Sequence, residues 1–399
     1  MECSVEKDDL LRCLYLVQGV VEKRSSLPIL AHVLIESIHE NVRAEEGKGG
    51  EEGNGLSIGA TDLEIGIRQN CKATVKKGGS ITTDARKLYE IVRELPPENV
   101  FLRSAGSGWI EVSSGKSRFR MASLDPKEFP AITPAQEAAE GDKQPTASCP
   151  SEVFREMIEK TLFAASPDET RLNLSGVYIE ALESGESSGS SKSRKIRMVS
   201  SDGHRLALIE REATVSDPAA WPKVILPRKG LLEARKLLER SEGDASFSLQ
   251  GTTAGLQKDT TRLSMRLVEG EFPDYQQILP KEHNFIIPFA REDLLSALRR
   301  LLILTTERSR GIKLQAEKGK VEISVNTPEL GEGVEELPTE YAGENITVGF
   351  NGRYMLEALG VMGEGQQISL SLKDDVSPGL LRMAEDPDFS YVIMPMRIF

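Results

Sequence analysis

The sequence predicts an α+β protein made of three tandem domains of one type. The first observation is a pattern that occurs three times, in residues 5–17, 150–162 and 288–302. Each stretch has acidic residues near its start and apolar residues at helical spacing, which is typical of an amphipathic helix. The second observation is that strand-like segments and a further helical segment follow in the same order each time.

The strand-like segments are rich in Val, Ile and Leu, and apolar and polar residues alternate along them. They read HVLIESI and LSIGATDLEIGI, then SGVYIEAL and IRMVSSDGHRLALIE, then GIKLQAE and KVEISVN. A second helix is expected in each copy, over 83–95, 226–239 and 350–362. We therefore expect two helices packed on β-sheets in each domain.

Each copy closes with an acidic residue shortly before an aromatic one, at Phe129, Phe272 and Phe389. These endings and the loops between copies set the expected domains at 1–131, 147–275 and 284–399. Polar, proline-containing stretches predict linkers at 131–147 and 280–284. Charged, Gly/Ser-rich insertions at 41–55 and 183–195 are expected to form flexible hairpin tips.

The composition is that of a soluble globular protein, with 39% hydrophobic and 28% charged residues among 399. No apolar run approaches the length of a membrane span, and MECSVEKDDL lacks the apolar core of a signal peptide, so no membrane association is expected. The four cysteines are scattered and form no CxxC pair. Neither a disulfide framework nor a cysteine zinc site is supported, and a reduced cytoplasmic location is the default.

The net charge of −12 argues against a simple basic nucleic-acid-binding protein. It does not exclude contact with a nucleic acid, because net charge does not say where the basic residues lie. Basic residues do occur on the predicted helices, interspersed with glutamates.

The segment SSDGHRLAL, residues 200–208, has the residue types of a hydrolase site. Catalysis by Asp202 and His204 would need a nucleophile and a base that converge in space. Neither Ser200 nor Ser201 lies in a GxSxG motif, and the sequence has no P-loop and no GxGxxG. The four histidines form no HxH or HxxxH pair, so we predict no metal site and no cofactor. A hydrolase is kept only as the alternative.

The simpler interpretation of the same segment is a tight turn at Asp202-Gly203 between two strands, because Asp-Gly is a strong hairpin signal. Leu206 and Leu208 then point to one side of the sheet. The pair His204-Arg205 is expected to be exposed at the exit of the turn.

The sequence ends in an apolar segment, YVIMPMRIF, although chain termini are usually polar. Val392 and Ile393 are typical of a strand, and Pro395 ends it because proline cannot donate to a β-ladder. Two interpretations stay open. The segment completes the core of the third domain, or Met394 and Met396 form one wall of an adaptable apolar groove.

Five motifs together resemble the bacterial DNA sliding clamp, the beta subunit of DNA polymerase III: SSDGHRLAL, EGEFPDYQQILP, LPRKG, RSSLPIL and YVIMPMRIF. The resemblance covers the whole chain in order. It implies the DNA clamp fold, with two protomers that close head to tail into a ring around duplex DNA. It also implies a non-enzymatic, cytoplasmic, nucleoid-associated homodimer without cofactors. The expected partners are the replicative polymerase alpha subunit, the clamp loader and other proteins with a clamp-binding motif.

The resemblance also carries site residues over to matching positions. The partner-peptide groove comprises Leu174, Ser201, Gly203, His204, Arg205, Leu206, Pro273, Ile278, Asn351, Tyr354, Val376, Pro378, Met394, Pro395, Met396 and Arg397. In it, Arg205 is expected to bind a partner carbonyl or to cover apolar surface with its stem. The DNA-binding residues are Arg24, Arg86, Arg228 and Lys229. The dimer interface comprises Lys87, Phe119, Met121, Ile303 and Leu304.

The sequence departs from the family pattern at a few positions. Leu172-Asn173 stands where the family often has two aromatic residues, so this loop is left out of the DNA site. Gln277 replaces an arginine of some members, so the affinity of the groove is expected to differ. A clamp paralogue that serves repair remains a second alternative.

Overall fold

The computed structural model describes ten stretches of the chain, namely 1–22, 26–39, 54–106, 108–132, 145–168, 170–182, 193–216, 221–239, 242–306 and 310–397. The six predicted helices are all present in these stretches: α1 Lys7–Val20, α2 Ala85–Glu94, α3 Ser151–Leu162, α4 Arg228–Leu238, α5 Arg291–Leu301 and α6 Gly352–Val361. The predicted acidic residues lie in the first turns of α1, α3 and α5. There they favour the helix because its N-terminus carries partial positive charge.

The chain divides into two compact units, which are described separately: residues 1–152 with 229–267, and residues 153–228 with 268–399. The strands of the first unit are β1 Glu2–Val5, β2 His32–His39, β3 Asn54–Thr61, β4 Ile65–Lys72, β5 Thr74–Lys77, β6 Ser80–Asp84, β7 Val100–Ser104, β8 Trp109–Ser114, β9 Ser117–Ala122, β10 Thr146–Pro150, β15 Asp244–Gln250, β16 Thr253–Lys258 and β17 Thr261–Arg266.

The strands of the second unit are β11 Gly176–Ala181, β12 Ser193–Ser201, β13 Arg205–Val215, β14 Val224–Pro227, β18 Phe285–Ala290, β19 Gly311–Glu317, β20 Lys320–Thr327, β21 Gly331–Pro338, β22 Ile346–Asn351, β23 Gln367–Leu372, β24 Gly379–Met383 and β25 Phe389–Ile393. Short 3-10 helices occur at Pro28–Ala31, Pro126–Glu128, Leu172–Leu174, Tyr275–Gln277 and Leu302–Leu304.

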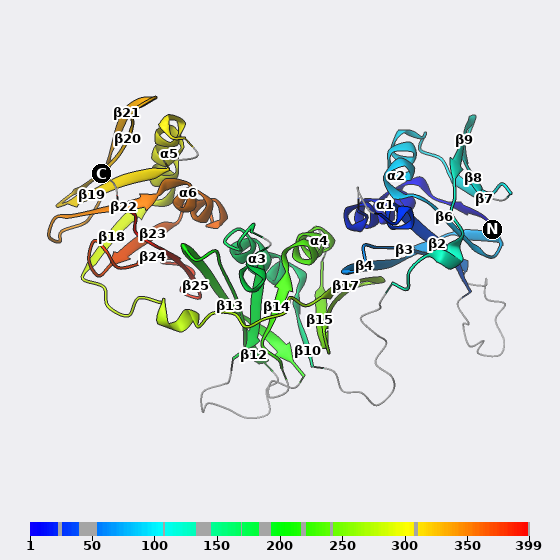
Figure 1. Cartoon of the computed structure of the whole chain (residues 1–399), viewed down its shortest axis with the longest axis horizontal. Coiled ribbons are helices and arrows are strands. Elements are labelled where there is room, and N and C mark those ends of the chain that lie inside the picture. Colours follow the sequence, from blue (N-terminus) through cyan, green and yellow to red (C-terminus); the bar gives the residue numbers. More distant parts are fainter. Residues whose placement is uncertain are drawn as a thin grey trace. The chain divides into compact units, whose positions relative to one another are not determined.

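In the first unit, helices α1 and α2 lie side by side over a sheet, as Figure 1 shows. The apolar stripe of α1, which includes Leu10, Leu14 and Val17, is fully buried against β3 and β4. Strand β4 also pairs with β17, with Ile67 opposite Leu263. The ladder therefore joins parts of the first and second predicted domains in one continuous sheet.

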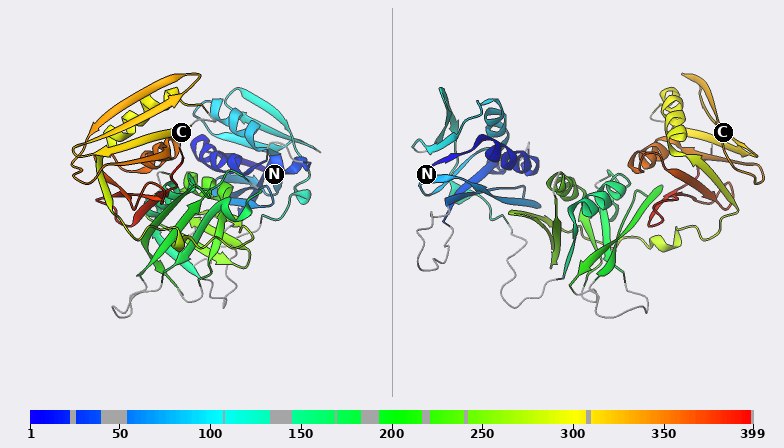
Figure 2. Two further views of the ribbon diagram at one scale, coloured as in Figure 1. Left: turned by 60° about the vertical axis from the view of Figure 1, so that its left-hand side comes forward. Right: turned by 180° about the vertical axis from the view of Figure 1, so that it is seen from behind.

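In the second unit, helices α5 and α6 also pack against each other, which the two views of Figure 2 show from other sides. The alternating burial along β19 and β20 fits the predicted half-buried strands. Strand β25 pairs with both β24 and β13, so its residues join the second and third predicted domains. All five residues of β25 are buried.

The two insertions fall where hairpin tips were expected. His39 pairs with Asn54 across β2 and β3, and Ala181 pairs with Ile196 across β11 and β12. Each insertion therefore connects two antiparallel neighbours. The residues 40–53 and 183–192 themselves lie outside the described residues, as do 133–144 of the predicted linker.

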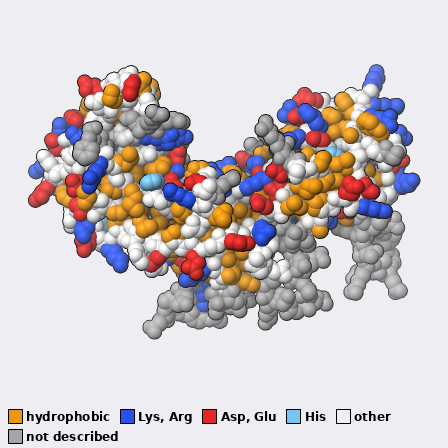
Figure 3. All heavy atoms as spheres, in the orientation of Figure 1, with side chains coloured by type: hydrophobic (Ala, Val, Ile, Leu, Met, Phe, Trp, Pro, Cys, Tyr) orange, Lys and Arg blue, Asp and Glu red, His pale blue; other side chains and the backbone are white. Residues whose placement is uncertain are grey.

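No helix among the described residues is long and apolar enough to cross a membrane. All four cysteines are free thiols with buried side chains. Charged side chains of both signs are interspersed with hydrophobic ones on the face shown in Figure 3.

Candidate functional site

The segment SSDGHRLAL forms the predicted turn between β12 and β13, with Ser201 paired to Leu206. Gly203 has a φ of +89°, which glycine adopts without steric cost. Asp202 Oδ1 accepts hydrogen bonds from the backbone N–H groups of His204 and Arg205, at 2.9 and 3.1 Å. Ser201 Oγ accepts from the Gly203 N–H and donates to the Arg205 carbonyl. The side chains of the motif thus stabilise the turn itself.

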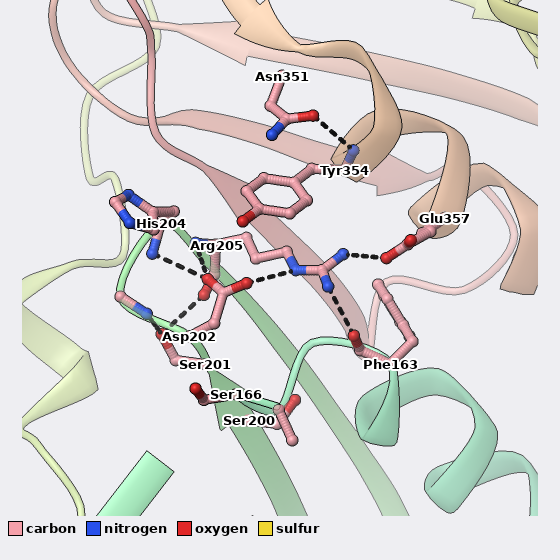
Figure 4. Close-up of polar contacts among 12 residues, drawn as sticks. Phe163, Ser166, Ser200, Ser201, Asp202, His204, Arg205, Asn351, Tyr354 and Glu357 are labelled. Atoms are coloured by element: carbon pink, nitrogen blue, oxygen red, sulfur yellow. Dashed lines mark hydrogen bonds and ion pairs between the residues drawn. The ribbon is translucent and has the colours of Figure 1, made fainter. Parts of the chain in front are cut away.

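This arrangement does not support the hydrolase alternative. Asp202 uses its second oxygen to bind Nε of Arg205 at 3.0 Å, and Ser200 donates to the Thr161 carbonyl. In Figure 4 the imidazole ring of His204 points away from the Asp202 carboxylate. A triad needs the acid to hold the imidazole and the imidazole to hold the nucleophile. Within the described stretches, no group of His, Cys, Asp or Glu is arranged to hold a metal ion.

Arg205 is buried, with 6% of its surface exposed, although the sequence led us to expect an exposed pair. That expectation is wrong for Arg205 and correct for His204, which is exposed. Nη1 of Arg205 donates to Glu357 on α6 at 2.6 Å, and Nη2 donates to the carbonyl of Phe163, just after α3, at 2.7 Å. The turn packs against these two helices, and the sequence pattern of the hairpin contains no sign of them.

The buried guanidinium remains charged because carboxylates surround it. Burial acts to lower the pKa of Arg205, but the nearby Tyr391, Glu357 and Asp202 raise it above its usual value. For Glu357, burial acts to raise the pKa, yet hydrogen bonds from Arg205 and Arg353 hold it below the usual range. Both partners are therefore ionised at neutral pH. Removing one would leave the other with a single charged partner, which is Asp202 for Arg205 and Arg353 for Glu357.

The apolar tail confirms the predicted strand end, because β25 stops at Ile393. Beyond it, the backbone N–H of Met394 donates to the His204 carbonyl at 2.9 Å, and that of Met396 donates to the Gly349 carbonyl at 2.8 Å. The interpretation that the tail completes a core holds for its strand residues. Residues up to Ile393 complete a core, whereas Met394 is half-buried and Met396 is 42% exposed.

A surface pocket of about 510 Å³ lies beside this tail. It brings together three residues of the predicted groove, Ile278, Pro378 and Met394. Gln277, which the sequence analysis linked to the affinity of the groove, also lines the pocket. The sequence analysis did not name the other lining residues, which are Leu279, Pro280, Lys281, Glu282, Lys373 and Ser377. Apolar and polar side chains both line the pocket, a combination that ligand sites commonly have.

The remaining predicted groove residues differ in their surroundings. Leu206 is buried in a core cluster with Val199, Tyr275 and Val392, and Ile278 packs against this cluster. Tyr354 lies over Arg205, with its ring centroid 4.2 Å from the guanidinium carbon. Asn351 caps α6 by accepting from the backbone N–H groups of Arg353 and Tyr354. The half-buried residues are Leu174 and Pro395, and the exposed ones are Pro273, Val376 and Arg397.

The predicted DNA-binding residues lie at the starts of helices, apart from Arg24, which is outside the described residues. Arg86 lies in the first turn of α2, and its Nε atom is buried without a hydrogen-bond partner in the described structure. Arg228 begins α4 and donates to the carbonyls of Leu162 and Ala165 at the end of α3. Lys229 is exposed and pairs with Asp62.

The predicted dimer-interface residues are largely at the surface. Phe119 and Met121 lie on β9, an edge strand of the sheet β5-β1-β7-β8-β9, and Phe119 is 40% exposed. Lys87 pairs with Glu90 on α2. Ile303, which follows α5, is 76% exposed, whereas Leu304 is half-buried.

Glu357, Phe163 and Tyr391 were missed by the sequence analysis. Glu357 binds Arg205 through its carboxylate on α6, and Phe163 binds it through a main-chain carbonyl. Tyr391 acts on it through a buried phenol. No sequence motif identifies any of these groups as a partner of Arg205. One sequence feature could have indicated Glu357: it lies three positions after Tyr354 on a predicted helix, so the two side chains share a face.

Comparison with known proteins identifies the family. Family models of the DNA polymerase III beta subunit match residues 50–133 as the N-terminal domain, 148–274 as the central domain and 276–397 as the C-terminal domain. The beta sliding clamp of Caulobacter vibrioides is 33% identical over 400 residues, and that of Pseudomonas putida is 34% identical over 399 residues. Each alignment covers 100% of both chains.

Solved structures agree over the full length. A DnaN sliding clamp from Bartonella birtlesii, bound to griselimycin, is 31% identical with a TM-score of 0.87 and covers 100% of both chains. The DNA polymerase III subunit beta from Pseudomonas aeruginosa is 33% identical with a TM-score of 0.85, again with 100% of both chains covered. With three tandem clamp domains of α+β architecture, the chain belongs to the family of bacterial beta sliding clamps, the beta subunits of DNA polymerase III.

Proposed function

We propose that this protein is a ring-shaped processivity factor that encircles duplex DNA and tethers the replicative polymerase. The observation that supports this most directly is the full-length match to beta sliding clamps in both sequence and structure. The function requires no bond-making step, no metal and no cofactor. It places the protein in the cytoplasm, on the nucleoid.

A closed ring is held on DNA by topology, so its contacts to phosphates stay weak and independent of sequence. Weak contacts let the ring slide. A net charge of −12 is compatible with this role if basic residues at the starts of α2 and α4 face the DNA. A polymerase bound to the ring then meets the primer end at high effective concentration, instead of diffusing away.

We assign the ring to a homodimer that closes head to tail. Support comes from two edge strands, β9 and β21, which leave backbone groups unpaired at the ends of their sheets in the described structure. Exposed apolar side chains lie on or near these edges, at Phe119, Ile303 and Val334. We place the domain boundaries at 1–131, 147–275 and 284–399, with the first domain of one protomer meeting the third of its partner.

The partner groove is assigned to the pocket beside Met394 together with the β12–β13 turn and the start of α6. Its apolar lining suits a short peptide with hydrophobic anchors. The expected ligands are segments of the polymerase alpha subunit, the clamp loader and other proteins with a clamp-binding motif. Griselimycin, found in the structure of the Bartonella birtlesii relative, is a convenient small probe for this groove.

Retention on DNA tests the proposal. The protein is loaded by a bacterial clamp loader onto a nicked circular plasmid, the complex is isolated, and the plasmid is then cut once. We expect the protein to stay on the circle and to leave the linear form. Equal loss from both forms would show that topology does not hold it, and the ring would have to be abandoned.

A further inference from the structure

The ring of Tyr354 stacks on the guanidinium of Arg205. The guanidinium carbon lies 4.2 Å from the Tyr354 ring centroid, well within the range of a cation–π contact. Tyr354 is half-buried and lies in the first turn of α6, beside the Asn351 cap. One face of its ring therefore rests on the cation, and we assigned the residue to the partner groove.

Arg205 itself is fixed from three directions, as Figure 4 shows. Each of its three guanidinium nitrogens donates one hydrogen bond, to Asp202 on the turn, to Glu357 on α6 and to the Phe163 carbonyl after α3. A planar guanidinium matches such a set of acceptors, and a lysine ammonium does not. The side chain cannot turn outward to a ligand without breaking all three bonds.

Two further hydrogen bonds tie the apolar tail to this centre. Met394 donates its backbone N–H to the carbonyl of His204, the residue before Arg205. Tyr391 donates its hydroxyl to the carbonyl of Tyr354 at 3.0 Å. The turn, the Tyr354 ring and the tail are thus joined to one another around one buried cation and its carboxylate partner.

We infer that Arg205 is a positioning residue, which Glu357 anchors and which acts on the partner peptide through the ring of Tyr354. This inference rests on the proposed groove, but it changes the role expected for Arg205 from ligand contact to internal support. It also assigns a role to Glu357, which lies outside the predicted groove. Preorganisation of this kind raises affinity by removing the cost of ordering the site on binding.

A double-mutant cycle distinguishes positioning from contact. Griselimycin affinity is measured by calorimetry for the wild type, for Arg205→Lys, for Tyr354→Leu and for the double variant. Arg205→Lys keeps the charge but not the three-way geometry, so we expect a loss of about 3- to 30-fold, the range set by a cation–π contact. In the Tyr354→Leu background the same change should cost less than about twofold, because the ring it supports is gone.

Variants of Glu357 test its role as the anchor of Arg205, with Arg353→Ala as the matched control. Glu357→Ala should weaken binding about as much as Arg205→Lys, and Glu357→Gln, which keeps an acceptor, should restore part of the loss. Arg353→Ala removes the exposed arginine that shares the same carboxylate, and it should change the affinity less than twofold. Thermal unfolding of each variant checks that the chain remains folded.

Three outcomes would contradict the inference. Equal losses for Arg205→Lys in both backgrounds would mean that the residue contacts the ligand directly or supports only the general fold, and the inference would be overturned. No loss in the wild-type background would overturn it as well. If the wild type does not bind griselimycin, the groove assignment falls together with the inference, whereas retention on circular DNA is read independently.

Discussion

Nζ of Lys160 on α3 lies 2.7 Å from Oδ2 of Asp386, a residue 226 positions further along the chain. Arg211 on β13 binds the same Asp386 oxygen at 2.6 Å and also binds Glu156. Two cations and two carboxylates thus share one half-buried cluster, which we call the Asp386 cluster. It joins residues of the second predicted domain to the turn before β25. The apolar tail, which we assign to the groove, follows directly after β25.

The Asp386 cluster makes stability depend on pH. Burial acts to raise the pKa of Asp386 and of Glu156, but hydrogen bonds from Arg211 and Lys160 outweigh it and lower both pKa values. A carboxyl whose folded pKa is depressed contributes stability that is fully present above its unfolded pKa, near 4. That stability is lost as the pH falls through the lower, folded value. We therefore expect the urea midpoint to drop as the pH falls below about 4.

Asp386→Asn tests the source of this dependence. The variant should lose about 1–3 kcal/mol at pH 7, because hydrogen bonds to charged groups are broken, and its midpoint should fall less steeply in acid. Asp375→Asn, at an exposed position, serves as the control and should behave as the wild type. An unchanged acid slope in Asp386→Asn would show that other carboxyls dominate.

Gly203→Ala should destabilise the turn by about 1–3 kcal/mol, because a non-glycine residue is strained at its φ of +89°. The nearest atom to an added Cβ is 3.7 Å away, on Arg171, so the cost comes from the backbone and not from a clash. Thermal unfolding and griselimycin affinity should fall together. Gly360→Ala is the matched control, since its Cβ meets nothing within 4 Å in α6, and helix propensity predicts a gain of about 0.5–1 kcal/mol.

The local structure was predictable because short-range patterns determine it. The six helices follow from 3.6-residue periodicity, and the turn at Gly203 follows from an Asp-Gly pair between apolar strands. The end of β25 follows from Pro395. In each case the sequence pattern that predicts the element lies within the element or directly beside it.

The burial of Arg205 was not predictable, because its partner Glu357 lies 152 positions away on another helix. An arginine after a turn has the same sequence pattern whether it faces solvent or a carboxylate. The contacts of Arg228 were not predictable either. It binds main-chain carbonyls at the end of α3, and every residue type has such a carbonyl. The resemblance named both arginines as site residues, but only the tertiary structure shows which atoms their side chains contact.

Ile303→Ala with Leu304→Ala should convert the dimer to monomers. Ile303 is 76% exposed in the described chain, so its burial against a partner explains an apolar residue at the surface better than packing within the protomer does. Sedimentation velocity measures the outcome. Leu172→Ala, which like Ile303→Ala truncates an exposed apolar side chain, should leave the dimer intact. A dimer that persists in the double variant would place the interface elsewhere.

Lys229→Glu should weaken binding to duplex DNA and lower the salt dependence by about one unit of slope, the amount expected for one lost phosphate contact. The Lys229 side chain is 44% exposed, and it pairs with the Asp62 carboxylate, whose side chain is 5% exposed. Fluorescence anisotropy on a short duplex at several salt concentrations gives the slope. Lys318→Glu makes the same charge change in the β19–β20 turn and should leave the slope unchanged. Equal effects of the two variants would mean that only net charge matters.

Deletion of residues 394–399 should abolish griselimycin binding while the dimer persists. The deletion removes Met394 from the pocket and also removes the backbone bonds of Met394 to His204 and of Met396 to Gly349. Strand β25 ends before the deletion, so its ladders with β13 and β24 are kept and the core should remain folded. Truncation after Arg397 is the control, because it leaves all these contacts in place. Calorimetry and a sizing column measure the two properties separately. Undiminished affinity after the longer deletion would show that the tail is not a wall of the groove, and that only the core-completing role of β25 remains for this end of the chain.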